Sequence, residues 1–266
     1  MIMAIGGYIM NRKYFFFDID GTLAIGSPGK YIPDSAKIAI EQLRAQGHFL
    51  AIATGRSYAM AHDYMKEIGF KNMVSDGGNG VTIDGKLLGI TPLDKQKAIA
   101  LIEECIEKDI IWAISPDNKK RRLAPDNRYF DFTKDTYMDT IVDENLDIYS
   151  FKEIHKVYVA CFPGEESKLE MLNELPFARY HKEYIFVEPD DKSVGIKRIM
   201  DHYQADYKDV VVFGDEKNDL KMFIPEWTAI AMGNAIEELK QKATYVTTDA
   251  KDDGIYNACK HFGWIQ

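Results

Sequence analysis

The sequence predicts an α/β fold in which a smaller α+β domain is inserted into a sheet of mainly parallel strands. Three observations predict this fold. Short apolar runs alternate with amphipathic helical segments near both ends of the chain. The first run, Tyr14–Phe17, is unbroken, as in strands that are buried on both faces. A hairpin signal, Asp84-Gly85, then interrupts the alternation. We therefore expect a core formed by residues 1–83 and 187–266, with residues 84–186 as the inserted domain.

Composition and charge exclude several classes of protein. The chain has 266 residues, 46% of them hydrophobic, which is enough for a substantial core. Its net charge of -9 argues against nucleic acid or an anionic membrane surface as a partner. No apolar run approaches the roughly 20 residues of a membrane-spanning helix. No GxxxxGK[ST] or GxSxG motif is present, so we set aside P-loop nucleotidases and serine hydrolases.

The cysteines and the N-terminal residues provide information about the cellular compartment of the protein. Cys105, Cys161 and Cys259 lack the spacing of zinc or redox sites, which predicts buried, reduced thiols in a cytoplasmic protein. The apolar stretch Met1–Met10 has neither a cationic leader nor a small-residue cleavage site, so we do not interpret it as a secretory signal. The sequence leaves open whether translation starts at Met1 or at Met10; with a start at Met10, the residues before it would be a weakly ordered extension.

Elements of the first part of the core follow the strand–helix order. After the strand at Tyr14–Phe17, Asp34 begins a helix that Gly47 ends, and residues 48–53 form a second buried strand. The sequence then predicts a helix at 57–68 and a strand at 73–75.

The remaining elements divide between the inserted domain and the second part of the core. We expect a strand at 81–83 at the end of the first part of the core. In the insertion we expect strands and helices at 86–90, 93–108 (helix), 110–115, 156–162, 165–175 (helix) and 180–187, the last reaching the first residue of the resumed core. Residues 118–145 are charged and predict no clear element. The core resumes with expected elements at 190–203 (helix), 209–213, 227–232, 235–242 (helix), 245–246 and 251–262 (helix).

Polar groups follow several predicted strands at the point where each strand ends. Because the carboxyl ends of parallel strands form one edge of a sheet, these groups should converge there. A cluster of carboxylates without a cation is mutually repulsive, and oxygen ligands of this kind suit Mg²⁺. Lys192, at the start of a helix, adds a cation that keeps an aspartate ionised and binds a phosphoryl oxygen. The groups are Asp18 and Asp20, Thr54 with Gly55, Asp215 with Asn218 and Asp219, and Gly233-Asn234.

Each signal has a simpler interpretation when it is taken alone. Asp18 and Asp20 could flank an ordinary turn, Thr54 could be a helix cap, and most lysines are solvated. The basic run at Lys119–Arg122 is usually a solvated face; Arg121, Arg122 and Arg128 are candidates for contacting a second anionic group of a substrate. The convergence of four strand ends favours the functional interpretation for the acidic groups.

The ordered motifs resemble those of the haloacid dehalogenase superfamily of phosphatases. The matching residues are Asp18-Ile19-Asp20-Gly21-Thr22-Leu23, Thr54-Gly55-Arg56, Lys192 and Gly214-Asp215-Glu216-Lys217-Asn218-Asp219. The insertion, together with Ala231-Met232-Gly233-Asn234-Ala235 and Asp253-Gly254, resembles the Cof-type subfamily with a C2B cap. The resemblance covers nearly the whole chain and implies a Rossmann-like parallel sheet with helices on both faces.

The resemblance also implies a mechanism, in which a phosphomonoester is hydrolysed through an aspartyl-phosphate. Asp18 is then the nucleophile and Asp20 the general acid and base. Mg²⁺ is held by the Asp18 carboxylate, the Asp20 carbonyl and Asp215, with Asp219 supporting the metal shell. Thr54, Gly55, Lys192 and Asn218 bind the phosphoryl group of a small phosphorylated metabolite.

Some positions depart from the family pattern, and two other functions stay open. Ser193 replaces a usual glycine after Lys192, which leaves Lys197 as a second candidate amine; Asp76 stands where relatives have Asn-Gly. The alternative functions are a phosphomutase or phosphotransferase that uses the same phosphoaspartate, and a non-catalytic phosphometabolite-binding protein. The cap residues show no readable code for the substrate.

Overall fold

The computed structural model describes residues 12–26, 31–179 and 181–266, and its chain divides into two compact units. The core unit comprises residues 1–55, 64–88 and 191–266, and the inserted unit comprises 56–63 and 89–190. The expectation for Met1–Met10 lies outside the described residues.

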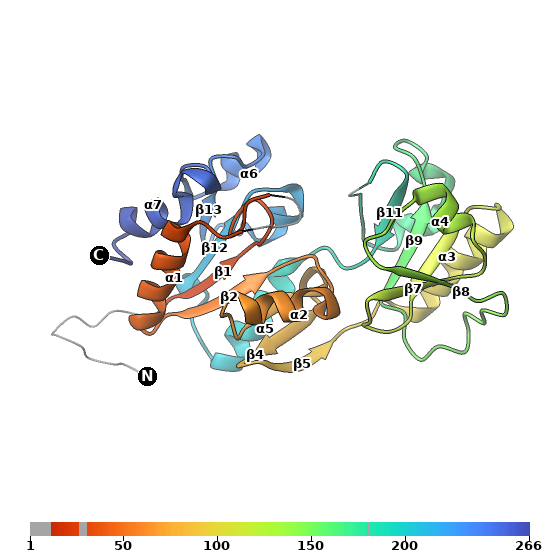
Figure 1. Ribbon diagram of the computed structural model, residues 1–266, viewed down its shortest axis with the longest axis horizontal. Helices are drawn as coiled ribbons and strands as arrows, with labels where there is room; N and C mark the ends of the chain where they lie inside the picture. Colours follow the sequence, from red (N-terminus) through yellow and green to blue (C-terminus); the bar gives the residue numbers. More distant parts are fainter. Residues whose placement is uncertain (1–11, 27–30, 180) are drawn as a thin grey trace. The chain divides into compact units, whose positions relative to one another are not determined.

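The core unit contains an eight-stranded sheet in the order β14-β13-β12-β1-β2-β3-β4-β5 (Figure 1). The strands from β14 to β3 pair in parallel, and β4 is antiparallel to β3. The strands are β1 (Tyr14–Phe17), β2 (Phe49–Ala53), β3 (Met73–Ser75), β4 (Gly80–Ile83), β5 (Lys86–Ile90), β12 (Val210–Gly214), β13 (Thr228–Ala231) and β14 (Tyr245–Val246).

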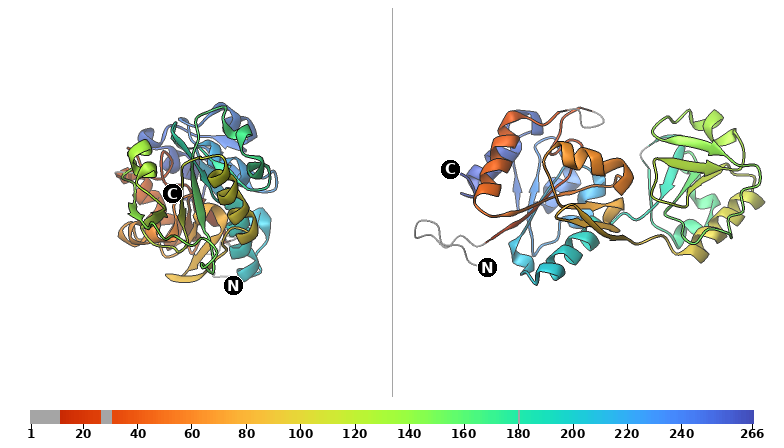
Figure 2. Two further views of the ribbon diagram at one scale, coloured as in Figure 1. Left: turned by 90° about the vertical axis from the view of Figure 1, so that its right-hand side faces the viewer. Right: turned by 60° about the horizontal axis from the view of Figure 1, so that its bottom comes forward.

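Strand β1 lies in the middle of this sheet because both of its faces are apolar. Phe15 packs edge-on against Trp264, whereas Phe16 belongs to the hydrophobic cluster on the opposite face, together with Ile196 and Leu239. The right-hand view of Figure 2 shows the parallel strands between α1 on one side and α5 on the other. The parallel α/β core with helices on both faces is therefore confirmed.

Helices connect the parallel strands, and α1 and α7 lie side by side (Figure 1). The α-helices of the core are α1 (Asp34–Ala45), α2 (Tyr58–Glu67), α5 (Lys192–Tyr203), α6 (Glu237–Lys242) and α7 (Gly254–His261). Its 3₁₀ helices are η1 (Asp76–Gly78), η4 (Tyr207–Asp209), η5 (Lys217–Met222) and η6 (Ala250–Asp252). The first residues of α2 group with the inserted unit.

The inserted unit has a six-stranded sheet in the order β10-β11-β9-β6-β7-β8. All neighbouring strands are antiparallel except β7 and β8. One face packs against α3, and the other carries a cluster around Tyr129 of α4. The elements are α3 (Lys95–Glu107), β6 (Trp112–Ser115), β7 (Arg121–Ala124), α4 (Arg128–Thr133), β8 (Asp139–Val142), β9 (Lys156–Ala160), η2 (Glu166–Lys168), η3 (Glu170–Asn173), β10 (Phe177–Ala178) and β11 (Tyr184–Val187).

The helix predicted at residues 165–175 is wrong, since this segment forms two separate 3₁₀ turns. Leu169 is extended between them, at φ -114° and ψ 104°. Its buried leucines, Leu169, Leu172 and Leu175, recur every three residues, which matches the three residues per turn of a 3₁₀ helix. The Glu104 carboxylate also accepts hydrogen bonds from the Glu170 and Met171 amides, and so replaces partners that a continuous helix would supply.

Two further expectations differ from the structure. The segment 118–145, for which the sequence predicts no element, contains β7, α4 and β8. The hairpin at Asp84-Gly85 is present, and both of these residues have positive φ, at 50° and 77°, as a tight hairpin turn requires. However, β5 belongs to the core sheet and residues 84–88 group with the core unit; apart from residues 56–63, the inserted unit consists of residues 89–190.

Within the described residues, none of the helices has the length and apolar character needed to cross a membrane. Cys105, Cys161 and Cys259 are buried and unpaired, as predicted.

Candidate active site

Three neighbouring parallel strands, β12, β1 and β2, deliver polar residues to one edge of the core sheet. Phe17, the last residue of β1, pairs with Phe213 on one side and with Ile52 on the other. The next residue, Asp18, donates its amide to the Phe213 carbonyl at 3.0 Å. Asp215 therefore follows the end of β12 beside Asp18, and Thr54 follows the end of β2.

The turn after Asp18 packs closely against Asp215 because Gly21 has no side chain. Gly21 has φ +87°, and a Cβ atom built on it would lie 2.1 Å from Asp215 Oδ2. Its amide donates to the Ala24 carbonyl at 2.9 Å, and the Leu23 amide donates to the Asp18 carbonyl at 3.1 Å. A larger residue at position 21 would displace the Asp215 carboxylate.

Two side chains fix the direction of the Asp215 carboxylate. Thr22 Oγ1 donates to Asp215 Oδ1 at 2.7 Å. Asn234 Nδ2 donates to Asp215 Oδ2 at 3.3 Å and to the Gly21 carbonyl at 2.9 Å. Thr22 had no role in the sequence analysis, although it lies inside the first motif. The sequence feature that could have identified Thr22 is a hydroxyl residue next to a glycine turn at the end of a buried strand.

Asp219 stabilises the loop that carries Asp215. Its Oδ2 accepts the amides of Asp215 and Glu216 at 2.9 and 3.1 Å, and its Oδ1 accepts Lys192 Nζ at 2.6 Å. Gly214 allows this close approach, because a Cβ atom there would lie 2.7 Å from Asp219 Cγ. Both Asp219 oxygens are thus already used by protein donors, so Asp219 is suited to supporting a metal site indirectly.

Lys192 is the amine that the structure brings to the cluster. It is the first residue of α5, and its Nζ donates to Asp18 Oδ1 and to Asp219 Oδ1, each at 2.6 Å. Its side chain is only 1% exposed. Burial alone would lower the pKa of Lys192, but the charges of Asp18 and Asp219 outweigh burial and raise it. Lys192 is therefore held as a cation.

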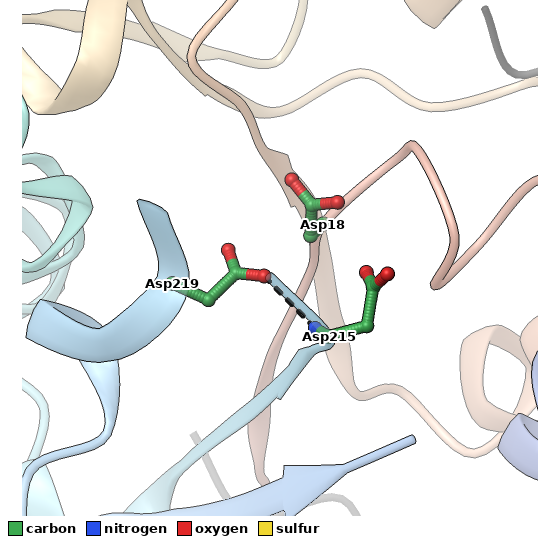
Figure 3. A group of neighbouring side chains, drawn as sticks. All are labelled: Asp18, Asp215 and Asp219. Carbon is green, nitrogen blue, oxygen red and sulfur yellow. Dashed lines mark hydrogen bonds between the residues drawn. The ribbon is translucent and has the colours of Figure 1, made fainter. Parts of the chain in front are cut away.

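Asp18, Asp215 and Asp219 converge from two distant parts of the chain (Figure 3). One carboxylate oxygen from each lies within 4.8 Å of the others, and all three residues are buried. Burial, followed by the charge of Asp219, raises the pKa of Asp18 well above its ordinary value, although Lys192 opposes the shift. Burial likewise raises the pKa of Asp215 to about 7. Three acids against one lysine leave this cluster with surplus negative charge.

The surplus charge and the donor atoms fit a hard divalent cation. Carboxylate oxygens are the protein ligands that Mg²⁺ accepts, and a cation there would offset the repulsion that raises these pKa values. Asn218, in η5, supplies a second observation: its Oδ1 is buried and has no hydrogen-bond partner among the described residues. An unsatisfied buried oxygen on the residue before Asp219 is able to accept a hydrogen bond from a metal-bound water or a ligand donor.

The other predicted site residues lie at the same edge but outside the carboxylate cluster. Asp20 is partly exposed in the turn after β1 and forms an isolated bridge with Ala24. Thr54 is buried at the end of β2, where its amide donates to the Val74 carbonyl at 2.9 Å, and Gly55 after it is partly exposed.

The three arginines proposed for a second anionic group are each engaged with carboxylates of the inserted unit. Arg122 is fully buried and pairs with Asp135, so its assignment to a solvated basic face is wrong. Arg121 pairs with Asp117 at 2.8 Å. Arg128 pairs with Asp109 at 2.7 Å and with Asp126 at 2.9 Å. These pairs oppose the proposed contact with a substrate anion.

Comparison with known proteins extends the likeness over almost the whole chain. Residues 15–259 match the family of haloacid dehalogenase-like hydrolases. The Bacillus subtilis protein YkrA is 31% identical over 260 residues, which cover 97% of this chain and 100% of that protein. The 5-amino-6-(5-phospho-D-ribitylamino)uracil phosphatase YitU of Bacillus subtilis is 26% identical, over 92% of this chain and 95% of that enzyme.

Solved structures show the same architecture. A protein from Geobacillus kaustophilus superposes with a TM-score of 0.82 and 32% identity, over 96% of this chain and 100% of that one. The sugar phosphatase BT4131, of subclass IIB of the superfamily, superposes with a TM-score of 0.75 and 26% identity, over 95% and 100% of the two chains.

Proposed function

The chain belongs to the haloacid dehalogenase-like hydrolase family as one of its phosphatases, and we propose that it is a Mg²⁺-dependent phosphomonoesterase that acts through an aspartyl-phosphate. One observation carries this proposal: Asp18 is buried at a strand end and is hydrogen-bonded to the Lys192 ammonium, with Asp215 and Asp219 close by. A buried carboxylate in this setting is oriented and stripped of water, as a nucleophile toward phosphorus requires.

The first half-reaction transfers the phosphoryl group to Asp18. A carboxylate oxygen of Asp18 forms a bond to phosphorus while the bond from phosphorus to the ester oxygen breaks. Asp20, protonated at this stage, gives its proton to the leaving oxygen, so the alcohol departs neutral. Lys192, Thr54 and the Gly55 amide hold the phosphoryl oxygens during transfer.

The second half-reaction returns Asp18 to its starting state. Asp20, now ionised, takes a proton from water, and the water oxygen bonds to phosphorus as the bond to Asp18 breaks. Inorganic phosphate leaves, and Asp20 is again protonated. The side chains of Asp18 and Asp215 and the Asp20 carbonyl would hold Mg²⁺, which neutralises charge on the phosphoryl oxygens.

For the substrate we propose a small phosphorylated sugar or sugar alcohol. Two likenesses support this class: YitU is named for a phosphoribityl compound, and BT4131 is described as a sugar phosphatase. A phosphoribityl compound and a sugar phosphate both carry a phosphate on a polyhydroxylated carbon chain.

The test is phosphate release from a panel of phosphorylated sugars, sugar alcohols, nucleotides and flavin or pyridoxal phosphates, with Mg²⁺ or with EDTA. We expect Mg²⁺-dependent release that is strongest for sugar or sugar-alcohol phosphates and absent in Asp18→Asn. Binding without turnover across the panel would support a phosphometabolite-binding protein instead. Phosphate that reaches a second sugar, and not water, would identify a phosphotransferase or mutase.

A further inference from the structure

The loop that follows β3 contains a buried aspartate in a strained conformation. β3 is parallel to β2, so Asp76 leaves the sheet at the same edge as Thr54. Asp76 is 4% exposed and has φ +52°. Left-handed backbone is less costly for Asp and Asn than for other side chains but still less favourable than for glycine, and burial of a carboxylate adds a desolvation cost. Glycine would be favoured there on backbone grounds, so the carboxylate needs its own explanation.

The Asp76 carboxylate closes the loop onto itself. Ser75 Oγ donates to Asp76 Oδ2 at 2.8 Å. This pair lies against the backbone of Gly80, where a Cβ atom would be 2.2 Å from Ser75 Oγ and 2.8 Å from Asp76 Oδ2. Ser75 and Gly80 are also paired across β3 and β4. The side-chain pair therefore defines how the loop between them is folded.

The same loop is docked on the first turns of α5. The Gly77 carbonyl accepts the Asp191 amide at 2.7 Å. A Cβ atom on Gly78 would lie 1.9 Å from the Asp191 carbonyl oxygen, and one on Gly195 would lie 2.8 Å from the Gly78 carbonyl oxygen. No side chain separates the loop from the helix at these points, so a shift of the loop moves the start of α5.

We propose that Asp76 is a positioning residue for Lys192. Lys192 is the first residue of α5, and its Nζ donates hydrogen bonds to both Asp18 and Asp219, each at 2.6 Å. This double contact tolerates little movement of the helix start. Asp76, held by Ser75, fixes the loop on which that helix start rests. The proposal depends on the function proposed above, in which Lys192 binds a phosphoryl oxygen.

The experiment measures the affinity for inorganic phosphate by calorimetry in the presence of Mg²⁺, together with KM and kcat. Asp76→Gly keeps the favoured backbone but loses the carboxylate. We expect the dissociation constant for phosphate and KM each to rise about tenfold. Asp76→Asn tolerates positive φ and still accepts the Ser75 hydroxyl, so it should stay within about twofold of wild type. Asp84→Gly is the matched control, because Asp84 has φ 50° in an exposed hairpin turn.

A double-mutant cycle separates positioning from general stability. If Asp76 acts through Lys192, Asp76→Gly should have no further effect on phosphate affinity in a Lys192→Met background. Unchanged phosphate affinity in Asp76→Gly, even with a lowered melting temperature, would overturn the proposal, and so would an undiminished effect in the Lys192→Met background. Failure of the wild-type protein to bind phosphate would count against the proposed function itself.

Discussion

Two buried charged clusters, one in each unit, differ in their balance of charge. In the core unit, three aspartates share one cation, Lys192. In the inserted unit, Arg122 forms an ion pair with one carboxylate of the described residues, Asp135; it also donates to the Asp135 carbonyl and to Thr140 Oγ1, each at 2.8 Å. Both clusters are shielded from solvent, so exposure does not distinguish them.

The pKa shifts of the aspartates run in opposite directions. Burial opposes ionisation of Asp135, but the hydrogen bonds it accepts and the charge of Arg122 outweigh burial and lower its pKa. The pKa values of Asp18 and Asp215 are raised, because burial and like charges prevail over Lys192. A balanced buried pair holds a structure together, whereas a surplus of buried charge is unfavourable until a ligand compensates it. The difference indicates which cluster is a functional site.

The largest expected effect is on the rate of catalysis at the cluster of Asp18, Asp215 and Asp219, where negative charge is in surplus. Asp18→Asn replaces the proposed nucleophilic oxygen but keeps the shape of the side chain, so we expect kcat to fall by about 10⁴-fold or more. Phosphate release measures the activity, and circular dichroism checks that the fold is kept. Activity above a few per cent of wild type would contradict the role of Asp18.

The second effect is on stability at the balanced pair. Arg122→Met leaves Asp135 buried without its cation, and we expect the free energy of unfolding to fall by about 3–5 kcal/mol. Urea titration measures it. The double variant Arg122→Met/Asp135→Leu removes both charges and should recover most of the loss. If the single variant is as stable as wild type, the pair is not the structural element described here.

The third prediction is that removing a charge from the cluster of Asp18, Asp215 and Asp219 raises the stability of the fold, whereas removing a charge from the Arg122–Asp135 pair lowers it. The pKa of Asp215 is raised to about 7, so its charge destabilises the metal-free fold increasingly as the pH rises from about 4 to 7. In EDTA at pH 8, Asp215→Asn should therefore be more stable than wild type, by about 2–4 kcal/mol. The gain should vanish near pH 3, where the aspartate is protonated in both the folded and the unfolded state. Denaturant titrations at the two pH values measure it; a destabilised variant at pH 8 would contradict the account.

The smallest effect comes from a pair that is balanced but exposed. Lys97 and Glu174 lie 2.9 Å apart in the inserted unit, with side chains 43% and 58% exposed. Water screens such a pair, so Lys97→Ala should leave the free energy of unfolding nearly unchanged. Urea titration beside Arg122→Met measures the contrast. An equal loss of unfolding free energy in the two variants would show that burial does not determine how much these ion pairs contribute to stability.

The sequence was most informative where a residue type and a strand end coincide. Asp18, Asp215, Asp219 and Lys192 were predicted to meet, because apolar runs define the strands and parallel strands share an edge. Thr22 and Asn234, which orient Asp215, could not be assigned these contacts from sequence, since tertiary packing decides which hydroxyl and amide reach a carboxylate.

The inserted unit was less predictable for a physical reason. Arg122 lies in a charged segment that favours an exposed face, yet it is buried by a partner thirteen residues away and by the rings of Tyr129 and Tyr158, at 4.7 and 5.3 Å. Sequence pattern cannot report such compensation. Similarly, leucines at intervals of three near residue 169 fit a helix about as well as they fit 3₁₀ turns.

The most direct measurement of the central claim is calorimetric titration of Mg²⁺ into metal-free protein at pH 7. The account predicts that one ion binds per chain, with release of protons because the pKa values of Asp18 and Asp215 are raised before binding, and that Asp215→Asn abolishes the heat. If Mg²⁺ does not bind, or if it binds equally well to Asp215→Asn, the carboxylates of Asp18 and Asp215 are not the cation site proposed here.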